Sequence, residues 1–331
     1  MEILSLSDND LQKAAEALKS GLLVAFPTET VYGLGADAFN ASALAKVFEA
    51  KNRPHFDPLI VHIAEYDTLS RVADVSALDS VAKERLSILS KQLWPGPLTL
   101  ILPKRSEVPN LATSGLPTVA VRFPSHPVAQ KLIQLSTGAV AAPSANPFGY
   151  ISPTRAEHVK NQLGENVDFI VDGGRATVGL ESSVLDLSHG TPRLLRPGGT
   201  SKEAIEALIG EVEFSFGSET DENQAQVSPG QLKSHYAPRT PLTLCRRKKL
   251  FSPLAPDEGR LYFSSPETVD NSAIQRIRVL SETGNLAEAA ANLFDMLHEL
   301  DSLGLKNIKA EEAPNFGLGV AINDRLRRAS F

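Results

Sequence analysis

The sequence predicts an α/β protein with two domains, a larger open sheet flanked by helices and then a smaller α/β unit. Over residues 1–210, short apolar runs bounded by turn residues alternate with amphipathic helical patterns, as in sheets built with crossover helices. An acidic, polar stretch interrupts this alternation after residue 210, and the alternation resumes from Leu242. The 331 residues are enough for two domains of ordinary size.

Eight apolar runs in the first domain, residues 1–210, are predicted to be strands, several of them buried on both faces. They are Leu22–Pro27, Leu59–Ile63, Leu98–Leu102, Val119–Phe123, Ala139–Ala142, Phe169–Val171, Val184–Leu187 and Leu194–Leu195. Amphipathic patterns predict helices at Asp10–Ser20, Ala41–Ala50, Ala77–Leu93, Pro127–Ser136, Thr154–Leu163 and Ala204–Ile209. Thr154 and Thr200 each stand three residues before a glutamate, so both are predicted to cap a helix.

Residues 211–241 are predicted to form a linker. Its first part, 211–226, has five acidic residues, no lysine or arginine, and too little apolar content for a core element. Its second part, 228–241, is rich in proline and glycine but also carries a tyrosine and basic residues, so we expect an ordered loop with a function there.

The second domain, 242–331, is predicted to be a smaller α/β unit. Its predicted strands and helices are Leu242–Leu244, Leu261–Phe263 and Ile277–Leu280, then Leu286–Leu303 and Val320–Ala329.

Composition excludes several classes of protein. Hydrophobic residues make up 42% and charged residues 22%, which is too apolar for a disordered chain. The single cysteine, Cys245, permits neither an intramolecular disulfide nor a cysteine zinc site. No apolar run approaches the roughly 18 residues of a membrane span, and the N-terminal residues do not resemble a signal peptide, so we expect a cytoplasmic protein without membrane contact. The net charge of −6 argues against a broad nucleic-acid surface, so any tRNA contact would be weak and local.

Common catalytic motifs are missing from the sequence. It contains no GxxxxGK[ST], HExxH, CxxC or GxSxG pattern, which disfavours P-loop, zinc-protease and serine-hydrolase chemistry. The segment Gly33–Ala38 matches GxGxxA, but no acidic residue closes a second strand about 20 positions later, so a dinucleotide site is disfavoured as well.

Polar side chains instead gather at the ends of the apolar strands, where ligands bind in open α/β sheets. The cations and the hydrogen-bonding residues that share this placement are Lys51, Arg53, Arg122 and Arg196, with Thr28, Thr30, Ser144 and Asn146. Together they predict a site for a polyanion beside a small polar pocket.

Taken one at a time, these residues also have plainer interpretations. Lys51 and Arg53 could be a solvated loop pair, and Arg122 could lie exposed on an edge strand. Ser144 and Asn146 could be turn formers before a proline, and His62 could be a core histidine with its hydrogen bonds satisfied. The joint pattern favours a site, because so many independent coincidences are improbable.

Several segments in fixed order resemble one family. They are FPTETVYGLG, KNRP followed by PLIVHI, LWPGPLTLIL, VAVRFPSHP, APSAN, GLESSVLDL and LLRPGG, then SPGQLKSHYAP and Gly317–Arg328. The first seven resemble the YrdC-like domain of the threonylcarbamoyl-AMP synthase family, and the last two resemble its two-domain form. The resemblance implies a YrdC-like twisted open sheet with flanking helices, followed by a linker and a smaller Rossmann-like α/β domain.

The resemblance implies a nucleotidyltransferase that makes L-threonylcarbamoyl-AMP from L-threonine, bicarbonate or CO2, and ATP, releasing pyrophosphate. Its product would serve a downstream tRNA threonylcarbamoyl-transferase complex that modifies the adenosine next to the anticodon. Threonine's amine adds to CO2, and the resulting carbamate can attack the α-phosphorus, so no nucleophilic side chain is needed. Mg²⁺ would be bound mainly through ATP, and no metal ligand from the protein is predicted.

The resemblance also implies residue roles. Lys51, Arg53, Ser144 and Asn146 would form the catalytic polar core. Threonine would lie among Thr30, His62, Arg122, Ala142 and Ser182. ATP would be bound by Arg53, Asp57, Thr118, Ser144, Ser152, Arg196 and Tyr236. His235 and Tyr236 would be a lid that keeps water from an easily hydrolysed mixed anhydride.

Two further expectations concern Asp57, Lys51 and Arg53. Asp57 would repel a phosphate unless its carboxylate faces ribose, base or metal. Replacing Lys51 or Arg53 with alanine should lower turnover far more than stability.

Two other functions stay open at this point. A non-catalytic module could bind tRNA or duplex RNA with the cationic cleft and the basic run Arg246–Lys249, although the acidic total and the 6% aromatic content argue against it. A carbamoyl-phosphate-type hydrolase is a weaker alternative that would need no threonine pocket.

Overall fold

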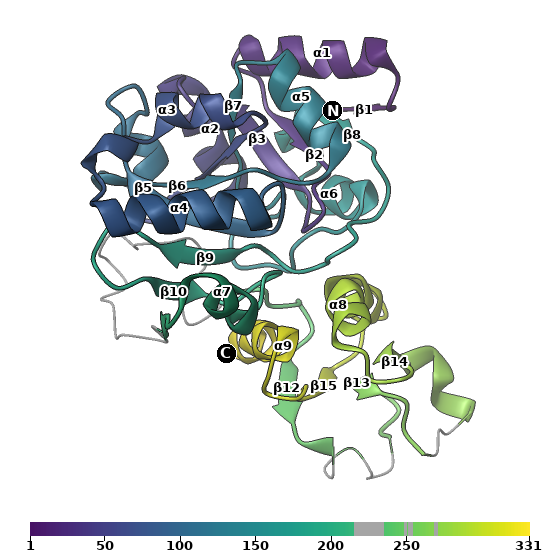
Figure 1. Cartoon of the computed structure of the whole chain (residues 1–331). Helices are drawn as coiled ribbons and strands as arrows, with labels where there is room; N and C mark the ends of the chain where they lie inside the picture. The colour runs from purple at the N-terminus through teal and green to yellow at the C-terminus, as the bar shows by residue number, and fades with distance from the viewer. Residues whose placement is uncertain (215–234, 248–249, 251–253, 268–270) are drawn as a thin grey trace.

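The computed structural model describes residues 1–214, 235–247, 250, 254–267 and 271–331. In this part of the chain the strands form two sheets (Figure 1). The larger has the order β1-β8-β2-β3-β7-β4-β6-β5-β9-β10-β11, and the smaller has the order β12-β15-β13-β14. The predicted fold class, an open sheet with helices followed by a smaller α/β unit, is confirmed.

Each of the eight strands predicted for the larger sheet is present, with ends that shift by one or two residues. The strands of this sheet are β1 (Glu2–Leu4), β2 (Val24–Phe26), β3 (Gly33–Asp37), β4 (Ile60–Ile63), β5 (Leu98–Pro103), β6 (Thr118–Arg122), β7 (Ala139–Ala141), β8 (Phe169–Val171), β9 (Ser183–Asp186), β10 (Arg193–Arg196) and β11 (Glu213–Phe214). Strand β3 was not predicted because its two glycines interrupt the apolar run. Gly35 is required there, since a Cβ would lie 2.8 Å from the Phe26 ring.

The helices that cover this sheet also follow the predicted pattern. They are α1 (Asp8–Lys19), α2 (Ala41–Lys51), α3 (Leu69–Val72), α4 (Ser80–Leu93), α5 (Pro127–Leu135), α6 (Ala156–Leu163) and α7 (Lys202–Ile209), with 3₁₀ turns at Tyr66–Thr68, Val75–Ala77, Asn110–Thr113 and Gly164–Asn166. Both predicted capping residues were wrong. Arg155 precedes α6 without a side-chain cap, and Ser201, not Thr200, accepts a hydrogen bond from the Ala204 amide at the start of α7.

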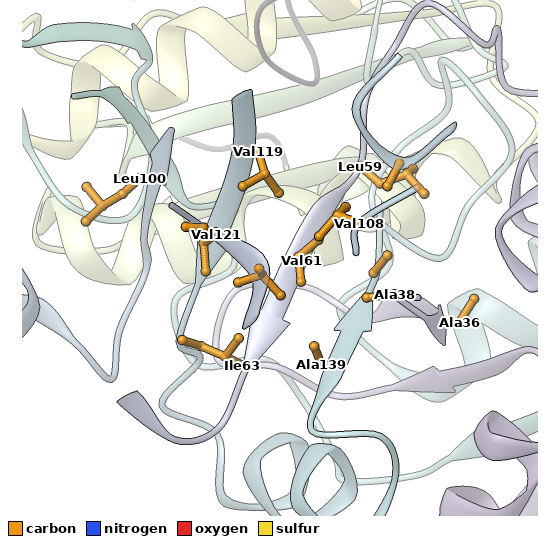
Figure 2. Close-up of a cluster of buried hydrophobic side chains, with 14 of the residues drawn as sticks. Ala36, Ala38, Leu59, Val61, Ile63, Leu100, Val108, Val119, Val121 and Ala139 are labelled. Carbon is orange, nitrogen blue, oxygen red and sulfur yellow. The ribbon is translucent and has the colours of Figure 1, made fainter. Parts of the chain in front are cut away.

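The direction of the side chains on β4 and β6 decides where a ligand can lie. The two strands are parallel, with Ile60 opposite Ala120 and His62 opposite Arg122. Alternate residues point to opposite faces. Val61 and its neighbours on one face join the main apolar core, in which Leu59, Ile63, Val119 and Val121 are also buried (Figure 2). The opposite face therefore presents His62 and Arg122.

The smaller sheet consists of four parallel strands among the described residues of the second unit. They are β12 (Leu242–Cys245), β13 (Glu258–Ser264), β14 (Ile277–Ser281) and β15 (Asn307–Glu311), and they are accompanied by α8 (Leu286–Asp301), α9 (Leu318–Ala329) and a 3₁₀ helix at Asn271–Arg276. Strand β15 was not predicted, because charged residues interrupt its apolar pattern. Of the predicted linker, residues 215–234 lie outside the described residues. None of the described helices has the length and apolar character needed to span a membrane.

The second unit packs against the first through α8. Asp295 accepts hydrogen bonds from Arg155 Nε at 2.7 Å and Arg155 Nη2 at 2.9 Å, and Arg175 Nε lies 3.3 Å from the same carboxylate. Gly179 touches the backbone of α8 directly, since a Cβ there would lie 2.5 Å from the Ala291 carbonyl oxygen. The two units are thus held together by an arginine–aspartate cluster and a close backbone approach.

Gly179→Ala is expected to loosen this contact. Gly174 is a matched control, because both glycines have a positive φ, 70° and 79°, but nothing lies within 4 Å of a Cβ on Gly174. Gly179→Ala should lower the free energy of unfolding by about 1–3 kcal/mol more than Gly174→Ala, the usual cost of forcing atoms into a packed site. Urea unfolding of the two variants measures the difference, and equal losses would contradict the proposed backbone contact.

Candidate active site

A cavity of about 50 Å³ lies on the face of β4 and β6 that carries His62 and Arg122. The residues that line it are Thr28, Thr30, Val31, Gly33, Arg53, Ile60, His62, Arg122, Ala142, Pro143, Ser144, Glu181, Ser182, Arg196, His235 and Tyr236. Three arginines and several hydroxyl groups therefore meet in one place. The site gathers where several strands end, as the sequence suggested: Arg122 and Arg196 are the last residues of β6 and β10, and Ala142 directly follows β7.

All five residues predicted to surround threonine line this cavity: Thr30, His62, Arg122, Ala142 and Ser182. Arg122 is buried, so its interpretation as an exposed edge residue was wrong. Its Nη1 donates to the Thr30 hydroxyl at 2.8 Å, and its Nη2 lies 2.7 Å from Glu29 Oε1. Burial alone would raise the pKa of Glu29, but the Arg122 guanidinium outweighs it and holds that pKa below its ordinary value. The two side chains form a buried ion pair that fixes the guanidinium.

His62 stays neutral in this environment. Its Nδ1 lies 3.1 Å from the Ile60 carbonyl oxygen, which suits a donating N–H. Burial, reinforced by the charge of Arg122, lowers the pKa of His62 to about 3. A neutral imidazole can accept a hydrogen bond from a substrate amine or hydroxyl without repelling a cation.

This buried histidine predicts a pH-dependent stability. Below the unfolded pKa of 6.5, the unfolded chain binds a proton at His62 that the folded chain does not bind. The free energy of unfolding should therefore fall as the pH falls, by about 1.4 kcal/mol per unit from this residue, and should not change through it above pH 6.5. Urea unfolding at pH 7.5, 5.5 and 4.5 tests this. His62→Gln should show a shallower dependence, and parallel profiles would contradict the assignment.

Arg53 lies in the cavity wall and is held rigidly there. Its Nη2 lies 2.9 Å from Asp57 Oδ2 and donates to the Pro58 carbonyl at 2.8 Å, while its Nε donates to the Asp57 carbonyl at 3.0 Å. Both side chains are buried, so the interpretation of Arg53 as part of a solvated pair was wrong. Asp57 does not line the cavity. Its carboxylate faces Arg53, which removes the expected conflict with a phosphate.

Lys51 and Asn146 stand behind the cavity wall. Lys51 is buried, and its Nζ donates to the carbonyl oxygens of Ser144, at 2.6 Å, and of Asn146. Asn146 Nδ2 donates to the carbonyls of Pro147 and Tyr150, both at 2.9 Å. Of the predicted catalytic core, Arg53 and Ser144 line the cavity. Lys51 supports the loop that carries Ser144.

The predicted ATP residues divide in the same way. Arg53, Ser144, Arg196 and Tyr236 line the cavity, and Asp57, Thr118 and Ser152 do not. Arg196 donates from Nη2 to the Ser182 carbonyl at 2.9 Å, and Ser152 donates to the Glu181 carboxylate. Thr118 begins β6 four residues before Arg122, about 13 Å away along the strand.

His235 and Tyr236, from the end of the predicted linker, form part of the cavity wall. The His235 amide donates to the Arg328 carbonyl at 3.1 Å, and the Tyr236 ring stacks on Phe294 with centroids 5.7 Å apart. Burial and the surrounding cations hold the pKa of His235 well below its ordinary value. With both residues in place, the free volume is far below the ~300–1,000 Å³ of a typical ligand pocket.

Comparison with known proteins assigns this chain to a family. Residues 16–198 match the family described as "Telomere recombination" (Sua5_yciO_yrdC), and residues 200–330 match "Threonylcarbamoyl-AMP synthase, C-terminal domain". Proteins named threonylcarbamoyl-AMP synthase are 41% identical to this chain in Bacillus subtilis, over 99% of this chain and 94% of that protein, and 41% identical in Pyrococcus abyssi, over 96% and 93%. The chain belongs to the threonylcarbamoyl-AMP synthase family.

The similarity extends to three dimensions. A crystal structure described as P. abyssi Sua5 complexed with L-threonine is 39% identical, with a TM-score of 0.90 over 100% of this chain and 98% of that one. Membership in the threonylcarbamoyl-AMP synthase family confirms the predicted enzyme class over the RNA-binding alternative. Within the basic run, Arg247 pairs with Glu311 at 3.2 Å, and Lys248 and Lys249 lie outside the described residues.

The residues that prediction missed are carboxylates and the arginine that neutralises one of them. Glu29 pairs with Arg122, and Glu181 pairs with Arg325 of α9 at 2.8 Å. All three missed residues lie inside segments that carry the threonylcarbamoyl-AMP synthase resemblance, so a signal was present. Buried guanidinium groups are better tolerated when each faces a carboxylate.

Proposed function

We propose that this cavity binds L-threonine beside ATP and forms L-threonylcarbamoyl-AMP from them and bicarbonate or CO2. The observation that carries the proposal is the meeting of Arg53, Arg122 and Arg196 in one cavity with the hydroxyls of Thr30 and Ser182. The L-threonine complex of the similar P. abyssi protein supports the amino-acid part.

Arg122 is the proposed partner of the threonine carboxylate. Its contacts to Glu29 and Thr30 hold the guanidinium in one orientation, so little reorganisation is needed when a ligand arrives. His62, being neutral, can accept a hydrogen bond from the threonine amine. These two residues are register partners on β4 and β6, so one rigid sheet fixes the distance between the groups they bind.

Arg53 and Arg196 are the proposed partners of the triphosphate. The carbamate oxygen forms a bond to the α-phosphorus while the bond from that phosphorus to the bridging oxygen breaks, and pyrophosphate leaves with the electron pair. Two fixed guanidinium groups stabilise the charge that develops on the leaving group. No side-chain nucleophile takes part.

Magnesium is proposed to enter with ATP. Among the described residues there is no group of three or more His, Cys, Asp or Glu that could hold a metal ion. The carboxylates next to the cavity are already engaged, Asp57 with Arg53 and Glu181 with Arg325. When bound, Mg²⁺ would neutralise phosphate charge, with most of its ligands from phosphate oxygens and water.

His235 and Tyr236 are proposed to act as the lid. The described cavity, of about 50 Å³, is small beside a nucleotide, which supports a lid whose two residues withdraw to admit ATP and return before the reaction. We further propose that the reaction takes place in the cytoplasm and that a tRNA threonylcarbamoyl-transferase complex consumes the product.

The decisive assay supplies ¹⁴C-bicarbonate, ATP and Mg²⁺ with and without L-threonine. Pyrophosphate release and labelled threonylcarbamoyl-AMP should both depend on threonine, and chelation of Mg²⁺ should suppress both. Pyrophosphate release that is indifferent to threonine would contradict the proposal. Salt-dependent tRNA binding without nucleotide binding would favour the RNA-binding alternative.

A further inference from the structure

Arg325 belongs to the second unit, but its side chain is fully buried against the wall of the cavity. Its Nε donates to Glu181 Oε2 at 2.8 Å, and its Cζ lies 5.0 Å from the centre of the Tyr236 ring. Glu181 and Tyr236 both line the cavity. One guanidinium from α9 therefore contacts two cavity residues that are distant in sequence.

The Arg325 guanidinium is itself fixed in place. Its Nη1 donates to Asp324 Oδ2 at 2.6 Å, and the other oxygen of Asp324 accepts from Arg328 Nε at 3.0 Å. The Arg328 carbonyl in turn accepts the hydrogen bond from the His235 amide. Helix α9 thus holds both lid residues, His235 through the backbone of Arg328 and Tyr236 through the guanidinium of Arg325.

The electrostatics also distinguish Arg325 from an ordinary salt bridge. Its Nη2 is buried without a hydrogen-bond partner among the described residues. A buried N–H group without a hydrogen-bond partner lowers stability, so the ion pairs with Glu181 and Asp324 do not by themselves explain why the guanidinium lies here. Contact with the Tyr236 ring gives this face of the guanidinium a favourable neighbour, because the ring face is electron-rich.

We propose that Arg325 is a positioning residue that holds Tyr236 and Glu181 in the closed arrangement and so protects the intermediate from water. The inference rests on the proposed function of the site. With Arg325 impaired, water reaches the mixed anhydride before release. Its attack on the carbamoyl carbon breaks the bond to the phosphate oxygen, giving AMP and N-carboxythreonine, which decomposes to threonine and CO2. The net result is conversion of ATP and water to AMP and pyrophosphate.

The test compares product partition in Arg325→Gln and the wild type. At initial-rate times, the ratio of AMP to threonylcarbamoyl-AMP should rise about fivefold and the KM for ATP about tenfold, while kcat for pyrophosphate release changes by less than about threefold. Arg325→Lys keeps the charge next to Glu181 and should fall between the two. If Arg325 had a purely structural role, its replacement would lower the amount of active enzyme without changing the ratio of AMP to threonylcarbamoyl-AMP.

Arg247→Gln is the matched control, because it removes an arginine–glutamate pair of the same unit away from the cavity. Arg247→Gln should give the wild-type ratio of AMP to threonylcarbamoyl-AMP. A rise in that ratio as large as in Arg325→Gln would overturn the specific role of Arg325. An unchanged ratio and KM in Arg325→Gln would overturn it as well. If Arg325→Gln does not fold, Asp324→Asn decides, with a smaller shift in the same direction expected and no shift contradicting the inference. A wild type that forms no threonylcarbamoyl-AMP would instead refute the proposed function.

Discussion

Arg53→Gln is expected to lower kcat/KM for threonine-dependent pyrophosphate release by about 10²–10³, or about 3–4 kcal/mol of transition-state stabilisation, as for other fixed electrostatic donors. The reason is geometric. Asp57 and two carbonyls hold the Arg53 guanidinium in the cavity wall, so its charge is in place before the pyrophosphate develops. Steady-state kinetics on protein shown to be folded by circular dichroism measures the loss.

Arg105→Gln serves as the control for Arg53. It removes an arginine–aspartate contact of 3.6 Å to Asp74 that is partly exposed and remote from the cavity. Such surface pairs contribute little, so kcat/KM should stay at the wild-type value. A rate for Arg53→Gln within about threefold of the wild type would rule out its role in charge stabilisation.

Lys51→Met is expected to destabilise the fold by about 3–5 kcal/mol. The ammonium donates to two carbonyls of the loop that carries Ser144, and methionine leaves both of these buried acceptors unpaired. Urea unfolding at pH 7.5 measures the change. The effect on stability departs from the sequence-based expectation, which assigned Lys51 mainly to turnover.

Lys46→Met provides a control on the same helix, α2. Lys46 is exposed, and its side chain makes a single hydrogen bond, 2.7 Å to the Gly21 carbonyl. Loss of this hydrogen bond should lower the free energy of unfolding by about 1 kcal/mol. Equal destabilisation by the two substitutions would show that the loop behind the cavity does not depend on Lys51.

The sequence was informative about the strands because apolar runs report burial directly. Strand β4 was predicted within one residue for this reason. Strands β3 and β15 were missed because glycines in β3 and charges in β15 interrupt the apolar pattern. Strands β1 and β11 were also missed, and they are only three and two residues long. At α7 the capping-box pattern did not specify which of two adjacent hydroxyl residues takes the cap. At α6 the helix begins at Ala156, and Arg155 before it makes no side-chain cap.

The site was predicted in part. The five residues that the motif resemblance assigned to threonine do lie in one cavity, but the resemblance did not separate residues in the cavity wall from those behind it. Lys51 and Asn146 share a motif neighbourhood with Arg53 and Ser144, and only the direction of each side chain distinguishes them. Which strand ends come together depends on strand pairing, such as that of β4 with β6, which a single sequence does not reveal.

One apolar cluster joins the two units and limits how the protein can be dissected. Val31, Ile151 and Leu180 are buried together with the apolar side chains of α8 and α9. Expressing residues 1–210 alone would expose these three side chains to water and leave an aggregation-prone apolar patch beside the cavity. Gene fragments meant to isolate the first unit should therefore carry polar replacements at Ile151 and Leu180, and should keep Val31, which lines the cavity.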